Sequence, residues 1–389
     1  MTPNLNAPAE ALYQCVKNLP IVSPHGHCDA SWFAKNTAFS NPAELLVTPD
    51  HYVFRLLYSN GISLADLGIG APGKHANPRE VFRIFAAHWH LFLGTPTRVW
   101  LDYVLRQTLQ ITAELSSETA NLIYDQIAER LTQDAFRPRA LFESFNIETL
   151  ATTDSALDDL CHHAAISASG WTGRVLPTFR PDGVLDPSDP NFQTNLQELE
   201  KITGIALDSY AGYLEALRVR RAFFIQMGAT ATDHAIEAIH TEWLYDPHAR
   251  YQRLKQGRGS PDDARRFYGH MLIEMAQMSV EDGLSMQIHG GSRRNTNRKI
   301  LQDYGRDMGA DIPVVSNWVT GLDSLLNRVG NEPNLTIILF TLDETTYARE
   351  LAPMAGHWPC LRIGPPWWVH DSAGGIARYF EQVGGTCSL

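Results

Sequence analysis

Short apolar runs alternate with longer amphipathic stretches along the chain from residue 147 onward. Each run is followed by polar residues and then by segments whose apolar positions recur with the period of a helix. Together with an earlier apolar run, the pattern predicts seven strands, which lie in 19–22, 147–154, 174–182, 228–234, 285–291, 335–341 and 361–368. The helices expected after them cover 157–168, 192–202, 209–219, 261–282, 297–304, 318–329, 345–355 and 374–383.

The stretch 31–143 follows a different pattern and contains no convincing strand. It shows the helical period in four segments, separated by proline and Asn-Gly positions, namely 50–60, 78–93, 97–109 and 118–131. A further helix is expected at 7–17, before the first strand. We therefore predict a helical insertion subdomain at 31–143, with 1–30 and 144–389 forming the main α/β fold.

Strands that alternate with helices are typical of a parallel sheet, and seven such units favour a (β/α)8 barrel over an open sheet. The eighth strand of this barrel should begin at 386–389, where the sequence stops. We therefore expect the eighth strand to be missing. A barrel without it has two unpaired strand edges, which favour aggregation or pairing with a partner.

The overall composition excludes several classes of partner. A formal net charge of -11 argues against nucleic acid, which requires a basic surface. The sequence has no run of about 18 apolar residues, so no membrane span is expected. The first residues show no secretory signal, and the five cysteines are scattered without metal-finger spacing. We expect a reduced, cytoplasmic protein.

Polar residues follow the predicted strands, at the ends where barrel enzymes carry their active sites. The first case is His25 and His27, which would point to the same face if the strand continued through them. Two converging imidazoles are natural metal ligands, although a lone His-x-His fits a polar loop equally well. Gly26 between them would let backbone or substrate come close. The other strand ends carry Asp154, Arg180 with Asp182, Asp233 with His234, His289, and His370 with Asp371.

A helix cap or a surface ion pair explains any single one of these residues about as well as an active site does. Asp154 and Asp371 could each begin a helix, and Arg180 could form a surface salt bridge. Several polar strand ends together are harder to explain in this way. The set as a whole indicates a site.

A series of short motifs runs from the first predicted strand almost to the end of the chain. They are His25-Gly26-His27, Asp50-His51-Tyr52-x-x-Arg55 with Asn60-Gly61, Thr152-Thr153-Asp154, Leu176-Pro177-x-x-Arg180-Pro181-Asp182, Asp233-His234, Gln287-Ile288-His289-x-Gly291-x-x-Arg294-x-x-Asn297 and Trp367-Trp368-x-x-Asp371. In these motifs the chain resembles the uronate isomerases (glucuronate/galacturonate isomerases) of the amidohydrolase superfamily. The resemblance implies a (β/α)8 barrel of the metal-dependent hydrolase type.

The chain departs from the family pattern at three places. Ser155 replaces the usual second acid after Thr-Thr-Asp, and the segment His289-Gly290-Gly291 is less typical than the family's His-x-Gly. The family's eighth strand carries an active-site aspartate followed two residues later by an arginine, and the sequence ends before it. This departure predicts that the chain binds metal weakly and turns over slowly or not at all.

The family reaction interconverts D-glucuronate with D-fructuronate, and D-galacturonate with D-tagaturonate, through a cis-enediol in hexuronate catabolism. By resemblance, His25 and His27 would weakly hold one divalent metal, and zinc is the expected ion. Tyr52, His51, Asp233 and His289 would be the catalytic residues, with Tyr52 moving protons and Asp233 fixing the tautomer of His289. The substrate would be bound by Arg180, Arg55, Arg294, Trp367 and Trp368, with Arg180 gripping the carboxylate.

Two other functions fit the same sequence. One is a metal-dependent hydrolase of the superfamily, such as a lactonase or deaminase. That class usually has a bridging carboxylated lysine or a glutamate on the fourth strand, where this chain has Asp233 and His234. The other is a non-catalytic subunit or remnant, suggested by the missing strand alone. Family members tend to be oligomeric, so the resemblance also implies a homo-oligomer.

Overall fold

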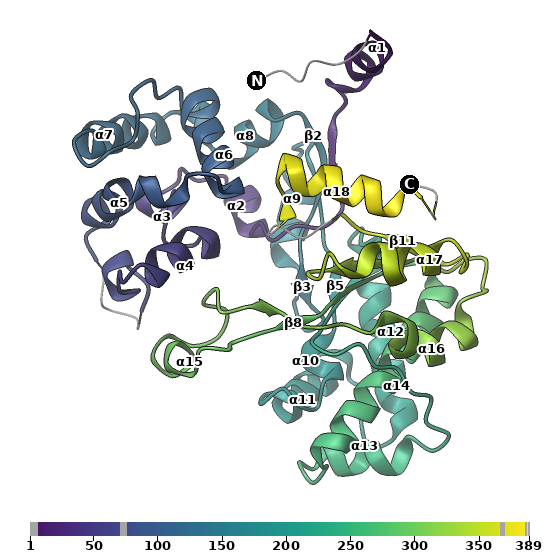
Figure 1. The fold of residues 1–389 in the computed structure, drawn as a ribbon. Helices are drawn as coiled ribbons and strands as arrows, with labels where there is room; N and C mark the ends of the chain where they lie inside the picture. The colour runs from purple at the N-terminus through teal and green to yellow at the C-terminus, as the bar shows by residue number, and fades with distance from the viewer. Residues whose placement is uncertain (1–6, 71–75, 366–369, 386, 388–389) are drawn as a thin grey trace.

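The computed structural model describes residues 7–70, 76–365, 370–385 and 387. Its centre is a parallel sheet whose strands follow one another in chain order (Figure 1). These strands are β1 (Ile21–Ser23), β2 (Ile147–Ala151), β3 (Asp154–Ser155), β4 (Arg174–Leu176), β5 (Phe179–Arg180), β6 (Ala231–Ile236), β7 (Ser285–Gly290), β10 (Ile337–Thr341) and β11 (Leu361–Ile363).

Two of the seven predicted strands are each interrupted once. Backbone bonds continue across the break, since Thr152 N–H donates to the Leu176 carbonyl at 2.9 Å and Asp154 N–H to the Thr178 carbonyl at 3.0 Å. Thus β2 and β3 form one strand position, and β4 and β5 form the next. The described residues therefore contain the seven parallel strand positions that the hydrophobic pattern predicts.

The sheet is open between its last and first strands in the part of the chain that the structure describes. There β11 pairs only with β10, and β1 pairs only with β2. Ile21 and Val22 of β1 are 50% and 57% exposed, as expected for a strand with one free edge. Whether the barrel lacks an eighth strand stays a prediction.

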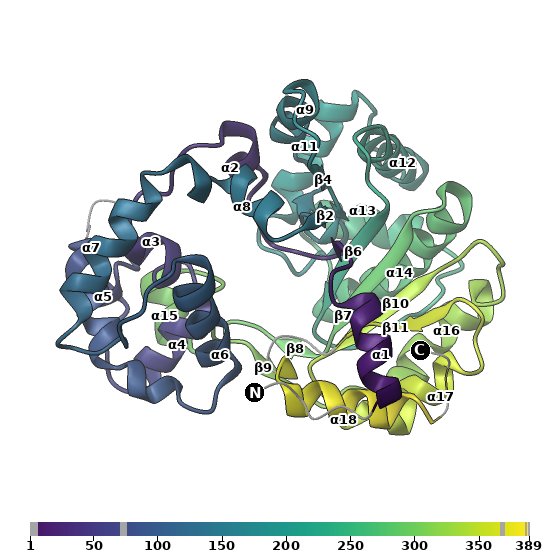
Figure 2. The same cartoon turned by 90° about the horizontal axis from the view of Figure 1, so that it is seen from above.

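Helices cover the outer face of the sheet and bury the larger hydrophobic core (Figures 1 and 2). Strand residues such as Phe179, Met286 and Leu339 pack there with helix residues such as Leu217 and Leu322. The covering helices are α9 (Cys161–Ala168), α10 (Asp182–Leu185), α11 (Phe192–Thr203), α12 (Tyr210–Gln226), α13 (His248–Lys255), α14 (Pro261–Asp282), α16 (Trp318–Val329), η5 (Tyr347–Leu351), α17 (Ala352–Ala355) and α18 (Ala373–Val383).

Several predicted helix boundaries are wrong. The helix α9 begins at Cys161 instead of 157, because Leu160 before it adopts a left-handed conformation with φ 53°. The helix α12 runs on to Gln226, since Phe224 near its end remains buried in the core. The segment 345–355 is divided into η5 and α17. In contrast, α14 and α16 have the predicted bounds.

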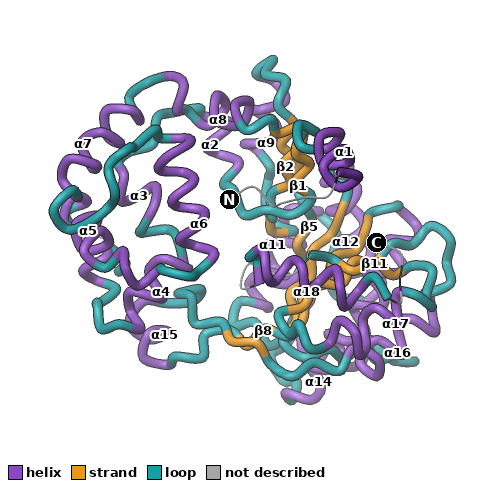
Figure 3. Tube along the Cα trace, turned by 45° about the horizontal axis from the view of Figure 1, so that its top comes forward, coloured by secondary structure: helices purple, strands orange, loops and turns teal. Residues whose placement is uncertain are grey.

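The described residues of the stretch 31–143 form helices joined by loops and no strand, and most of these helices share a hydrophobic core (Figure 3). Its helices are α2 (Ala30–Lys35), α3 (Pro42–Leu46), α4 (His51–Ser59), η1 (Ala65–Leu67), α5 (Pro78–Ala87), η2 (Trp89–Phe92), α6 (Pro96–Tyr103), η3 (Val104–Thr108), α7 (Ala120–Leu131), η4 (Asp134–Phe136) and α8 (Pro138–Ser144). A lead-in helix, α1 (Ala7–Val16), precedes β1 as predicted.

An arm from the main fold packs against this helical subdomain. It leaves the sheet after β7 and contains β8 (Ser292–Arg293), α15 (Arg298–Tyr304) and β9 (Ile312–Pro313). Figures 1 and 2 both show α15 beside α4. Ile300 of the arm is buried in the helical core, and a Cβ on Gly309 would lie 3.3 Å from the His51 carbonyl oxygen. The arm therefore connects the strand ends to the helical subdomain.

No helix in the described ranges is both long enough and apolar enough to cross a membrane.

Candidate active site

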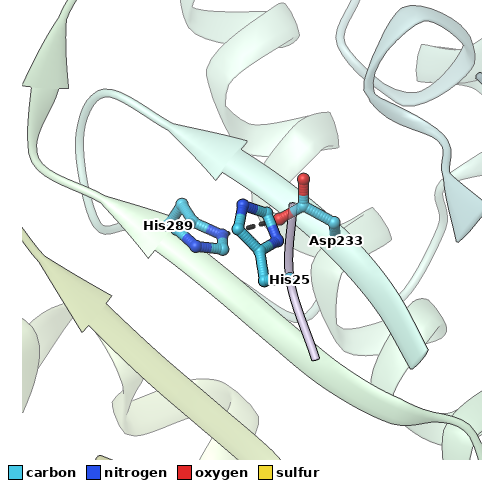
Figure 4. Close-up of side chains that lie close together, drawn as sticks. All are labelled: His25, Asp233 and His289. Carbon is cyan, nitrogen blue, oxygen red and sulfur yellow. Dashed lines mark hydrogen bonds and ion pairs between the residues drawn. The ribbon is translucent and has the colours of Figure 1, made fainter. Parts of the chain in front are cut away.

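Three polar side chains that are far apart in sequence meet at the sheet, and Asp233 lies within β6, which continues beyond the predicted end to Ile236. They are His25 from the loop after β1, Asp233 from β6 and His289 from β7, and their candidate ligand atoms lie within 4.8 Å of one another (Figure 4). In the register of β6 and β7, Asp233 lies opposite Gln287, two residues before His289. Side chains at these positions share one face of the sheet, which brings the carboxylate and the imidazole together.

The carboxylate of Asp233 holds the ring of His289. His289 Nδ1 lies 2.6 Å from Asp233 Oδ1, and the ring stacks on Phe340 of β10 with centroids 4.3 Å apart. An ionised carboxylate can only accept a hydrogen bond, so Nδ1 carries the proton and Nε2 the lone pair. The predicted pairing of Asp233 with His289 is therefore present in the structure.

The first strand does not continue through the two histidines of the first motif, as it would have to for strand alternation to bring them together. β1 stops at Ser23, and Pro24 has no N–H with which to continue the ladder. His25 and His27 consequently lie in a loop, and the alternation of a strand does not explain how they converge. They converge nonetheless, with 3.2 Å between their Nε2 atoms.

His25 is suited to bind a cation in its neutral form. Burial, and then the nearby His289, lower the pKa of His25 to about 3. Its Nδ1 is buried and has no hydrogen-bond partner among the described residues. The ring lies 4.3 Å from that of His289, centroid to centroid. Two or three imidazoles beside a carboxylate form a donor set that fits a divalent transition metal, so the residues present support a metal site.

Arg180 lies between two carboxylates. Its Nε donates to Asp182 Oδ2 at 2.9 Å, and its Nη1 lies 3.4 Å from Asp233 Oδ2. Burial alone would raise the pKa of Asp233, but the hydrogen bond from His289 and the charge of Arg180 hold it well below its usual value. Burial raises the pKa of Asp182, although Arg180 acts in the opposite direction. Both oxygens of Asp233 are thus engaged by cationic or N–H groups.

The predicted residues on the helical subdomain are not part of this cluster. Asp50 caps α4, accepting bonds from the backbone N–H groups of Tyr52 and Val53. Tyr52 and Arg55 line a cavity of about 480 Å³ between α4, α6 and the arm, and none of the three cluster residues lines it. Burial, and then the nearby Asp50, raise the pKa of Tyr52 far above its usual value. Tyr52 therefore stays protonated near neutral pH and can donate a hydrogen bond.

The other predicted residues have different positions. His51 packs against Phe54, with ring centroids 5.3 Å apart, and Arg294 Nη1 lies 3.6 Å from Asp307 Oδ1. His234 faces the opposite side of the sheet from Asp233, because neighbouring residues of a strand alternate between its two faces. It is fully buried there, and its Nε2 lies 3.0 Å from Thr232 Oγ1. Trp367 and Trp368 lie outside the described residues, so their role in binding the substrate stays a prediction.

Two residues near the cluster were not predicted from the sequence. Phe340 stacks on His289, and Gln287 donates through Nε2 to the Pro24 carbonyl oxygen at 3.2 Å. Phe340 lies near the end of a predicted strand, which is a signal that could have pointed to it. The partner of Gln287 is 263 positions away in sequence, and no local pattern indicates such a contact.

A parallel α/β fold whose first strands follow chain order, with histidines and an aspartate at the strand ends, defines a β/α-barrel enzyme with a candidate metal site. The sequence profile of the glucuronate isomerase family matches residues 4–387. The chain therefore belongs to the glucuronate isomerase family.

Individual relatives agree with this assignment. A uronate isomerase of Rhizorhabdus wittichii is 52% identical over 383 residues, covering 98% of this chain and 82% of the relative. The crystal structure of glucuronate isomerase from Caulobacter crescentus is 49% identical with a TM-score of 0.94, covering 97% of this chain and 79% of that one. A uronate isomerase structure from Thermotoga maritima superposes with a TM-score of 0.90 at 26% identity, covering 97% and 82%.

Proposed function

We propose that this chain interconverts D-glucuronate with D-fructuronate, and D-galacturonate with D-tagaturonate. The observation that carries the proposal is the family match over residues 4–387, in a chain whose His25, Asp233 and His289 meet at the strand ends. The relatives do not favour a lactonase-like or deaminase-like hydrolase. β6 also contains no lysine, the residue that often bridges the metals in that class. The relatives also do not favour a non-catalytic remnant, whereas slow turnover stays a prediction.

The reaction moves one proton from C2 to C1 of the open-chain sugar and a second from the C2 hydroxyl to the C1 oxygen, and it leaves the overall oxidation level unchanged. A cis-enediol forms when C2 loses its proton and the carbonyl oxygen on C1 gains one. It collapses to the ketose when C1 gains a proton and the hydroxyl on C2 loses one. We propose that His289 is the base that removes the proton from C2. Its Nε2 carries the lone pair, because its Nδ1–H is hydrogen-bonded to Asp233. The negative charge of Asp233 stabilises the imidazolium that results.

The C6 carboxylate of the substrate needs a positively charged partner, and we propose that Arg180 binds it. Nε and Nη1 of this residue face Asp182 and Asp233, while Nη2 makes no hydrogen bond within the described ranges. Two neighbouring aspartates fix the guanidinium in place, so little side-chain freedom is lost when the substrate binds. Arg55 and Arg294 remain further proposals for binding the sugar.

Tyr52 would donate its O–H to a sugar oxygen, because its raised pKa rules out a tyrosinate base near neutral pH. We propose that His51, at the start of the same helix, closes over the sugar with it.

His25 and His27 would hold one divalent metal, for which we propose zinc. When bound, the metal would polarise the sugar oxygens at C1 and C2. Catalytic zinc sites usually have three protein ligands, so two histidines alone predict weak binding.

We further propose that the protein is cytoplasmic. The five cysteines form no disulfide in the part of the chain that the structure describes, which supports a reducing compartment. Assembly into a homo-oligomer stays a prediction.

A comparison of substrates tests the function. Purified chain with added zinc is incubated with D-glucuronate, D-galacturonate, D-glucose and a uronolactone, and the products are followed by ¹H NMR. We expect ketose signals from the two uronates only, since D-glucose lacks the carboxylate that Arg180 would bind. Hydrolysis of the lactone without conversion of either uronate would contradict the proposal and support the hydrolase.

A further inference from the structure

The loop that carries the two histidines has no strand ladder to hold it. β1 ends at Ser23, and the described part of the sheet gives this strand a neighbour on one side only. Even so, the Nε2 atoms of His25 and His27 lie 3.2 Å apart, and His25 lies against His289. Other contacts must fix the loop.

Side chains bind three successive backbone carbonyl groups of this loop. Gln287 Nε2 donates to the Pro24 oxygen at 3.2 Å, and Ser23 Oγ donates to the His25 oxygen at 3.3 Å. Gln287 is 2% exposed and shares its face of β7 with His289. Its Oε1 is buried without a partner among the described residues, so an amide at this position carries the cost of an unsatisfied acceptor.

The third carbonyl group is that of Gly26, which accepts a hydrogen bond from Thr153 Oγ1 at 2.9 Å. Thr153 lies at the break between β2 and β3. A Cβ on Gly26 would lie 2.9 Å from the Ala151 carbonyl oxygen, so the loop approaches the neighbouring strand as closely as glycine allows.

The backbone on both sides of Thr153 is itself fixed. Thr152 Oγ1 donates to Asp154 Oδ2 at 2.7 Å and lies 2.9 Å from His163 Nε2. Asp154 Oδ2 also accepts a bond from the Thr178 backbone N–H at 3.2 Å. Thr153 is thus a rigid donor directed at the histidine loop.

We propose that Thr153 and Gln287 are positioning residues that hold the carbonyl groups of Gly26 and Pro24 and thereby set the positions of the His25 and His27 nitrogens for a metal. The inference rests on the proposed metal site. Neither residue touches the metal or the sugar in this account, since each acts through the backbone of the loop.

The test compares Thr153→Val, which removes the hydroxyl, with Thr153→Ser, which keeps it, and with Gln287→Met, which removes the amide at similar length. Thr241→Val is the matched control, because Thr241 Oγ1 donates to the Gly321 carbonyl at 2.7 Å outside the site. The dissociation constant for Zn²⁺ is measured by competition with a chromogenic chelator, and the midpoint of thermal unfolding is measured alongside.

We expect Thr153→Val and Gln287→Met to weaken Zn²⁺ binding about 10-fold or more, as is usual when groups that orient metal ligands are removed. Thr153→Ser should stay within about 3-fold of the wild type. Thr241→Val should lower the unfolding midpoint and leave Zn²⁺ binding unchanged. Wild-type affinity in Thr153→Val, or an equal loss in Thr241→Val, would overturn the inference.

The outcomes also separate this inference from the proposed function. A wild-type chain that binds no Zn²⁺ overturns the inference, because the loop would then have no metal to receive. If Zn²⁺ binding depends on Thr153 but the chain converts no uronate, the positioning role is supported and only the proposed isomerase function is contradicted. A crystal structure of Thr153→Val gives a readout without metal, in which an unmoved His25 would contradict the inference.

Discussion

Replacing Asp233 by asparagine is expected to lower kcat/KM for D-glucuronate by about 100-fold or more, because general-base catalysis of the kind proposed for His289 contributes about 10²- to 10⁴-fold and depends on this carboxylate. The side-chain amide of asparagine has one oxygen and one NH2 group in place of the two carboxylate oxygens, and it carries no charge. The pair with Arg180 is therefore lost, and His289 no longer faces an anion that stabilises its protonated form. We also expect the free energy of unfolding to fall by about 3 kcal/mol, since the partly exposed Arg180 loses a buried partner.

A matched variant separates catalysis from stability. Asp282→Asn removes a carboxylate that pairs with the buried Arg221 at 2.6 Å, away from the strand ends. It should destabilise the protein in urea unfolding and leave kcat/KM within about 3-fold of the wild type. If Asp233→Asn loses no more activity than Asp282→Asn does, Asp233 has only a structural role.

Replacing Gly26 by alanine is expected to lower kcat/KM by about 100-fold, the scale of loss when catalytic groups move by about 1 Å. The new Cβ would lie 2.9 Å from the Ala151 carbonyl oxygen, and a backbone oxygen inside a sheet cannot move aside. The loop must move instead and take His25 and His27 with it. Steady-state kinetics with D-glucuronate, together with the Zn²⁺ dissociation constant, measure this displacement.

Gly374→Ala is the control for this variant. A Cβ at Gly374 would meet only the flexible end of Arg378, at 3.6 Å, so activity should be unchanged. A Gly26→Ala chain with wild-type kinetics and Zn²⁺ affinity would show that the close approach to β2 does not position the histidines.

Local patterns in the sequence predicted much of the fold. Seven strands followed from apolar runs, because a parallel strand that is buried on both faces needs apolar residues along its length. The bounds of α14 and α16 followed from sharp start and end signals, such as Ser260 before Pro261 and Gly283 after Asp282. The end of β1 did not, because the two histidines resembled a continuation of the strand although Pro24 stands between them and β1.

The candidate site could be predicted in part for the same reason. His25, Asp233 and His289 each follow or end an apolar run, so their positions at the sheet could be read from local sequence. The bonds of the loop carbonyl groups to Gln287 and Thr153 join residues 263 and 127 positions apart, and only the packed fold creates them. The raised pKa of Tyr52 likewise depends on burial by neighbours such as Trp100.

The central claim is that the 389-residue chain moves a proton between C2 and C1 of a hexuronate at the His25, Asp233 and His289 cluster. The most direct measurement is a ¹H NMR time course of D-glucuronate in D₂O with zinc, run with the wild type and with His25→Ala. We expect the wild type to form D-fructuronate with deuterium at C1, and His25→Ala to form it no faster than the buffer blank. A D-glucuronate spectrum that the wild type leaves unchanged, or equal conversion by His25→Ala, would contradict the account.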